Sequence, residues 1–254
     1  MKKWVIILGV LFISYPAMSE ISGICGATAE ACSYVLDDNG KLTITGNGAM
    51  SEHSGYNPPW GTDIKEVSIS GITSIASHAF VGSKITSIVI PDTVTSIGSY
   101  PFEGSTITSI TLPASLKNLS AGVFATNRTI ENVFIPDSLF ENGSYFSDLA
   151  LSGGHVKNLI CSAEKQQACQ EYLSNAKGYK SGPWPQPTEP LPNRDKIGVL
   201  TYRKDENGHI IFKNKKYASF SDIASGRYIP KRIYTVEEAN AATGKKNKVM
   251  IKYK

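Results

Sequence analysis

Recognisable catalytic and metal-binding motifs are absent from this sequence of 254 residues. It has no Gly-x-Ser-x-Gly, no His-Glu-x-x-His, no P-loop and no dinucleotide-binding glycine fingerprint. Its four histidines are isolated from one another, and no Cys-x-x-Cys pair provides the spacing of a zinc site. We therefore predict no catalytic residue, no metal and no cofactor, and keep an enzyme with an unrecognised site as an alternative.

A long apolar run occurs only near the N-terminus. Two lysines precede an apolar stretch at residues 4–15, and small residues follow at positions 17 and 19. A stretch of about 12 residues is too short to span a bilayer but is typical of a secretory signal peptide. We predict that residues 1–19 are removed before Glu20. The mature chain is then exported to the periplasm, the cell surface or the medium, with no transmembrane segment.

Cysteines are few, and all four lie in the expected mature chain, at Cys25, Cys32, Cys161 and Cys169. Exported proteins use cysteines mainly in structural disulfides, which makes a metal site the weaker alternative. Four cysteines allow three pairings, and the entropy of loop closure favours the two local ones. We predict the disulfides Cys25–Cys32 and Cys161–Cys169.

An internal repeat occupies the middle of the chain. Phe80, Phe102, Phe124 and Phe146 follow one another at intervals of 22 residues. Between them recurs a strand-like phrase, I-x-x-I-x-I, whose last two apolar positions alternate as in a β-strand. The versions of this phrase begin at Ile64, Ile85, Ile107, Ile130 and Val156. A period of 20–29 residues is typical of leucine-rich repeats, which bury their apolar faces only by stacking. We predict a right-handed leucine-rich-repeat solenoid of about five rungs.

Two stretches resemble a known family. The phrase P-D-x-V-T-S-I-G-x-x-x-F at residues 91–102 is similar to the repeat of BspA-like bacterial surface proteins, a leucine-rich-repeat subfamily. The text CSYVLDDNGKLTITGNGAM at residues 32–50, followed by Pro-Pro-Trp at 58–60, resembles the N-terminal cap of that family. The resemblance covers roughly residues 25–160. It implies a secreted or surface-exposed binding protein, and it assigns no ligand.

Caps and a second unit are expected around the repeats. A strong Asn-Gly turn signal predicts a β-hairpin over residues 33–48, and Ser162 can begin a helix. The predicted organisation is an N-terminal cap at 20–60, repeats at 61–161, a capping helix at 162–180, a proline-rich linker at 181–194 and a small basic α+β domain at 195–254. In the last unit we expect a hairpin of Val199–Lys204 with His209–Lys213, a short helix opening at Thr235 and a strand at Asn247–Lys254.

Charge divides the mature chain into two parts. Residues 20–194 hold ten lysines and arginines against sixteen aspartates and glutamates, whereas residues 195–254 hold fourteen against six. The basic tail could bind an anionic surface polymer, dock on the acidic repeats, or be an ordinary solvated surface. Nucleic acid is not expected, because the chain is exported.

Outward-facing strand positions form the predicted binding surface for a protein ligand, which could serve adhesion. Alternation places them on the concave sheet, opposite the buried residues. These positions are Val89, Thr111, Asn132, Phe134, Asn158 and Ile160. An exposed aromatic can anchor a partner, which would be the role of Phe134. The alternative is that the linker or the tail covers Phe134.

Overall fold

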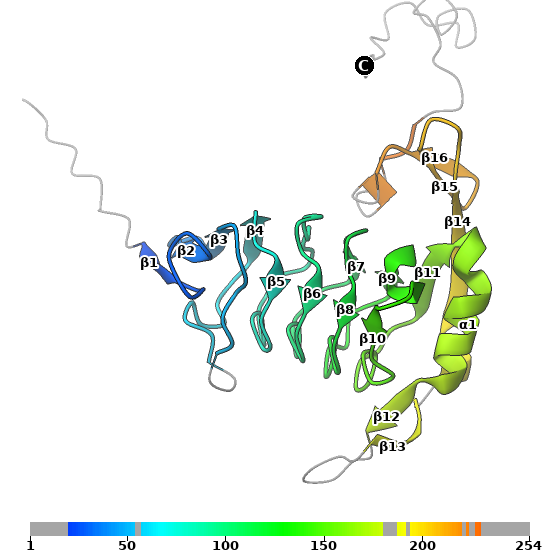
Figure 1. The fold of residues 1–254 in the computed structure, drawn as a ribbon, viewed down its shortest axis with the longest axis horizontal. Coiled ribbons are helices and arrows are strands. Elements are labelled where there is room, and N and C mark those ends of the chain that lie inside the picture. Colours follow the sequence, from blue (N-terminus) through cyan, green and yellow to red (C-terminus); the bar gives the residue numbers. More distant parts are fainter. Residues whose placement is uncertain are drawn as a thin grey trace, which may run out of the picture.

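The computed structural model describes residues 20–53, 57–179, 187–191, 194–219, 222–223 and 227–229. The repeats stack side by side into a solenoid whose short strands run parallel (Figure 1). The predicted leucine-rich-repeat fold, with a hairpin cap at one end and a helix at the other, is confirmed. Within the described residues, no helix is both long and apolar enough to cross a membrane.

The N-terminal cap is a sheet that continues into the first repeat. Its strands, in the order β1-β2-β3-β4, are β1 (Ile21–Ile24), β2 (Ser33–Leu36), β3 (Lys41–Thr45) and β4 (Glu66–Ser70). β2 and β3 form the predicted antiparallel hairpin, with Gly40 at a positive φ of 82° in the turn. β3 then pairs parallel with β4, so the hairpin covers the open apolar end of the solenoid. Trp60 is buried beneath it, and its indole N–H donates to the carbonyl of Ala79.

The repeats after β4 contribute strands to two further sheets on different sides of the solenoid. In the stretch 85–90 this contribution is only the isolated bridge of Val89 with Thr111. One sheet contains β5 (Ser74–Ile75), β6 (Ser96–Ile97), β8 (Asn118–Leu119) and β10 (Tyr145–Phe146). The other contains β7 (Ser109–Thr111), β9 (Asn132–Phe134), β11 (Asn158–Ser162), β14 (Gly198–Lys204), β15 (Ile210–Phe212) and β16 (Lys215–Tyr217). The inward-pointing residues of the repeat strands, such as Ile97, Ile110 and Leu159, form one continuous core.

A column of aromatic rings runs along the axis of this core. Phe80, Phe102 and Phe124 are fully buried and stack with ring centroids 5.5 and 6.2 Å apart and interplanar angles of 9° and 13°. Trp60 extends the column at its N-terminal end, 6.1 Å from Phe80. Stacked planar rings fit the spacing of neighbouring rungs, so phenylalanine is suited to the same core position in each of these three repeats.

Phe146 does not continue this column, although it keeps the spacing of 22 residues. It pairs with Leu119 in the β8–β10 ladder and stacks on Tyr172 of the capping helix, 3.8 Å away. On the rung after Phe124 the chain is represented by Ala150 and Leu151, both buried, because the backbone N–H of Val123 donates to the carbonyl of Ala150. The repeat is longer here: the 3-10 helix η1 (Asp137–Phe140) occupies the same place as the turn Pro113–Leu116 of the preceding repeat, and the extra residues lie between Leu139 and β10.

The C-terminal cap is the short helix α1 (Gln166–Asn175), preceded by the 3-10 turn η2 (Ala163–Lys165). The hydroxyl of Ser162 accepts from the backbone N–H of Lys165, which is the predicted capping contact. The helix buries Cys169, Tyr172 and Leu173 against the last rung, and the disulfide Cys161–Cys169 ties it there. The second predicted disulfide, Cys25–Cys32, lies in the N-terminal cap.

The tail begins as an extension of the solenoid. After the strand pair β12 (Lys177–Tyr179) and β13 (Pro187–Pro190) and the turn η3 (Arg194–Lys196), β14 pairs in parallel with β11 over five residues. The expected hairpin forms, because β14 and β15 are antiparallel neighbours. β14 covers the edge that β11 would otherwise expose. The expected helix from Thr235 and strand at 247–254 lie outside the described residues.

Truncation of the central ring should test the stacked core. Phe102→Ala removes a fully buried side chain between two stacked neighbours and should lower the free energy of unfolding by about 3–5 kcal/mol. Tyr145→Ala, at a position 58% exposed on β10, is the control and should cost under about 1 kcal/mol. Equilibrium denaturant unfolding measures both, and equal losses would contradict a core role for Phe102.

Candidate functional site

The strand face that points away from the solenoid core brings the predicted site residues together. Parallel pairing aligns Asn132 with Asn158 and Phe134 with Ile160, and Thr111 lies beside Phe134. An isolated bridge joins Val89 to Thr111. We call this surface the outer strand face, and define it by Val89, Thr111, Asn132, Phe134, Asn158 and Ile160.

Four of these residues reach solvent to different degrees. Val89 is 70% exposed, which is unusual for an apolar residue beside a regular sheet. Thr111, Asn132 and Asn158 are half-buried. The amide of Asn158 donates to the side-chain oxygen of Asn132 at 3.0 Å, so these two residues form a short ladder across neighbouring rungs.

The expected exposure of Phe134 and Ile160 is wrong. Both point away from the solenoid core, as strand alternation requires, but they are only 3% and 1% exposed. They belong to a second apolar cluster whose other buried members come from the tail: Tyr202, Ile210, Phe212 and Tyr217. The rings of Phe134 and Phe212 meet edge to face, 6.1 Å apart. Neither residue can therefore contact a ligand while the tail holds this position.

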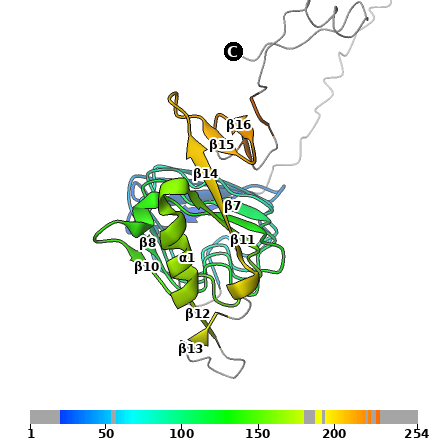
Figure 2. The same ribbon diagram turned by 90° about the vertical axis from the view of Figure 1, so that its right-hand side faces the viewer.

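The cover over Phe134 follows from the pairing of β14 with β11. β14 extends beyond the solenoid, and β15 and β16 fold from its end (Figures 1 and 2). The inner side of this three-stranded unit supplies the aromatic residues that meet Phe134. The unit closes the C-terminal half of the outer strand face, and Val89 lies in the half that remains open.

Charge on the tail unit is positive and largely solvent-exposed. Lys204, Lys213 and Lys215 are exposed, and Lys215 lies over the ring of Tyr228 with its Nζ 4.7 Å from the ring centroid. Lys216 instead forms an ion pair, with its Nζ 2.6 Å from Oδ2 of Asp205. That hydrogen bond is the main reason why the pKa of Asp205 falls to about 2.

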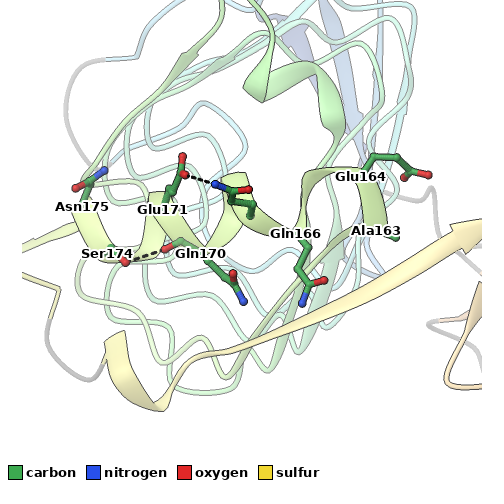
Figure 3. A pocket seen from close by; sticks show the side chains of 8 residues that line it. Ala163, Glu164, Gln166, Gln170, Glu171, Ser174 and Asn175 are labelled. Carbon is green, nitrogen blue, oxygen red and sulfur yellow. Dashed lines mark hydrogen bonds between the residues drawn. The ribbon is translucent and has the colours of Figure 1, made fainter.

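A shallow polar surface lies along the outer side of α1 (Figure 3). Among its residues, Gln167 donates to Glu171, and the hydroxyl of Ser174 donates to the carbonyl of Gln170. It is lined by Ala163, Glu164, Gln166, Gln167, Gln170, Glu171, Ser174 and Asn175. The hydroxyl of Ser174 is thus bonded to the backbone rather than to a base. Within the described part of the chain, no group of three metal-ligating side chains converges.

Comparison with known families agrees with this geometry. A family model for the BspA type leucine-rich repeat region matches residues 60–167 with six copies. The match is therefore to BspA-type leucine-rich repeats over this stretch, which is less than half of the chain. Repeats of this kind suggest a protein-interaction role and are typical of non-enzymatic binding proteins. The matched region contains all six residues of the outer strand face.

Matches to individual proteins are sparse. No curated protein matches the chain. Among solved structures, a leucine-rich repeat protein from Eubacterium ventriosum is 25% identical, with a TM-score of 0.49 over 77% of this chain and 49% of that chain. The chain thus spans about half the length of that protein.

The residues that sequence reasoning missed are those of the tail that cover the outer strand face. The sequence shows that Phe134 and Ile160 are apolar residues at outward positions. It also shows that Tyr202 and Phe212 are apolar residues of the predicted tail hairpin. Their mutual contact depends on β14 joining the repeat sheet, which no local pattern specifies. The apolar character of adjacent outward positions was the available signal that something covers them.

Removal of the covering contact should loosen the tail and leave the repeats folded. Phe134→Ala deletes a buried ring at the junction and should lower stability by about 3 kcal/mol or more, with earlier protease cleavage in the tail. Val89→Ala is the control on the open half of the face and should change little. Melting curves and limited proteolysis measure both, and an unchanged tail would mean that Phe134 is not held by it.

Acid should weaken the tail unit through Asp205. Its pKa falls from 3.8 to about 2 on folding, so the ionised carboxylate stabilises the folded state above pH 3.8. That contribution is lost as the pH falls from 3.8 through about 2. Asp205→Asn should remove this part of the pH dependence, whereas Glu206→Gln, an exposed neighbour, should keep it. The measurement is tyrosine fluorescence as a function of pH for the wild type, Asp205→Asn and Glu206→Gln.

Proposed function

We propose that the protein is exported and binds a protein partner through the open half of the outer strand face, as an adhesin-like module of the cell surface. The observation that carries this proposal is Val89, a large apolar side chain 70% exposed at the isolated bridge beside β7. Rigid apolar positions lose little conformational entropy on binding, which favours them as contact points. Thr111 lies beside Val89, and the linked amides of Asn132 and Asn158 supply polar groups on the two rungs that follow.

Export is supported by three features. The N-terminal segment has the pattern of a signal peptide, both disulfides fit an oxidising compartment, and BspA-type repeat proteins are surface or secreted proteins. Mass spectrometry of the exported protein should find a mature chain that begins at Glu20 and lacks free thiols.

Binding should be tested by probing an array of secreted and cell-surface proteins with the mature chain. Val89→Asp should weaken a genuine interaction by about 2 kcal/mol, roughly thirtyfold, because it places a charge in the apolar part of the contact. Thr95→Asp is the matched control, since Thr95 is also β-branched and exposed, and precedes β6 of the other sheet in the same repeat. Equal affinities for the two variants would contradict binding through this face.

A second function is favoured by the charge of the tail unit. Exposed Lys204, Lys213 and Lys215 could bind an anionic polymer of the cell envelope, in which case the repeats serve as a support. Lys213→Glu with Lys215→Glu should then lower the salt concentration that elutes the protein from an anionic polysaccharide column. The control is Lys65→Glu with Lys117→Glu, which changes the net charge by the same amount but lies outside the tail unit. It should elute at a salt concentration close to that of the wild type. Loss of all binding by the tail variant alone would favour this second function over the first.

A further inference from the structure

We propose that the open edge of β1 binds a basic C-terminal segment, residues 245–254, of a second copy of this chain, so that the solenoids associate head to tail. The proposal concerns the N-terminal cap, and it does not depend on binding through the outer strand face.

The first observation is that β1 is an edge strand without protection. β1 is the terminal strand of its sheet and pairs only with β2 among the described residues. Its sequence, Ile-Ser-Gly-Ile, contains no charge and no proline, and Ile21 and Ile24 are 53% and 59% exposed. Natural proteins normally protect such an edge, because its unpaired backbone groups can bind another strand. An apolar, uncharged edge is therefore expected to have an occupant.

At the C-terminal end of the structure, the edge strand β16 is protected by charged side chains and by further chain. Lys215 and Lys216 place charge on the edge strand β16. The backbone N–H of Ile229 donates to the carbonyl of Lys216, so further chain already pairs along that edge. The two ends are thus treated differently.

The second observation is that β1 is held rigidly. The disulfide Cys25–Cys32 joins β1 to β2 directly after their last pair, Ile24 with Ser33. The backbone N–H of Cys25 also donates to the carbonyl of Cys32 at 2.8 Å. A rigid edge loses little entropy when a strand is added, which favours recognition by backbone hydrogen bonds.

The third observation is charge complementarity, which identifies the occupant. The cap and first strand, residues 20–66, contain seven acidic residues against two lysines. Residues 245–254, KKNKVMIKYK, contain five lysines and no acidic residue. Oppositely charged segments attract each other over about one Debye length, so this segment is the part of the chain best matched to the cap.

The sequence of the segment also suits an added strand. Val249, Ile251 and Tyr253 alternate with lysines and Met250, so a strand of these residues would have one apolar side. Ile21 faces the same side of its sheet as Leu36, which belongs to the solenoid core. Pairing with β1 would place the apolar side next to Ile21 and extend that core. Because donor and acceptor differ, the contact is heterologous and can continue from copy to copy.

Sedimentation of the mature chain at increasing concentration tests the association. At low salt we expect concentration-dependent oligomers, with affinity falling as salt screens the charges. Ile24→Lys and deletion of residues 245–254 should each raise the dissociation constant by about tenfold or more. Tyr145→Lys is the matched control, because Tyr145 is 58% exposed on a strand remote from the cap in sequence, and it should associate normally. A wild-type chain that stays monomeric at all concentrations would overturn the proposal. This result is also expected if the segment binds β1 of its own chain, which the proposal does not allow.

A mixing experiment separates this arrangement from its rivals. The Ile24→Lys chain retains a donor segment, and the truncated chain retains an intact β1 edge. Each should therefore be monomeric alone, and the two should form a one-to-one complex when mixed. Slower amide exchange at Ser22 and Ile24 of the truncated chain in the complex would locate the contact. If the truncated chain still self-associates while Ile24→Lys does not, two β1 strands pair with each other and the donor is wrong.

Discussion

Stacking of equivalent side chains on successive rungs is the constraint on which the rest of this structure depends. No repeat can bury its own isoleucines and phenylalanine, so each rung is stable only against its neighbours. The rings of Phe80, Phe102 and Phe124 show this directly, because each forms the surface on which the next one packs. Everything at the two ends of the solenoid can be understood as a way of terminating that stack.

The two ends solve this problem with different elements. At the N-terminal end, a hairpin and the buried ring of Trp60 complete the core with a sheet that is itself open along β1. At the C-terminal end, α1 closes the core, and β14 continues the strand ladder beyond it. The tail unit thereby covers Phe134 and Ile160, which makes the outer strand face asymmetric: its C-terminal half is covered, and its N-terminal half is open. Any partner of this face has to approach from the side of Val89.

Polar and charged contacts add to the stability of the stacked repeats by different amounts. Exposed ion pairs such as Lys84 with Asp63 and Lys157 with Glu131 join successive rungs, and pairs of this kind contribute little each. The buried amide of Asn127 matters more, because it donates to Ser105 and accepts from the backbone N–H groups of Thr129 and Ile130. It satisfies backbone donors at a turn that a purely apolar core would leave unpaired.

Sequence alone determined the features that repeat or that are local. The period and the alternation of apolar residues predicted the solenoid. The Asn-Gly turn predicted the hairpin, Ser162 the start of the capping helix, and the short separation of the cysteines the two disulfides, because each of these depends on short-range spacing. Tertiary structure decided what depends on a single long-range contact. The pairing of β14 with β11 buries Phe134 and Ile160, and a longer connection between Leu139 and β10 moves Phe146 out of the aromatic column. Such contacts leave no periodic trace, since they occur once and join segments far apart in the chain.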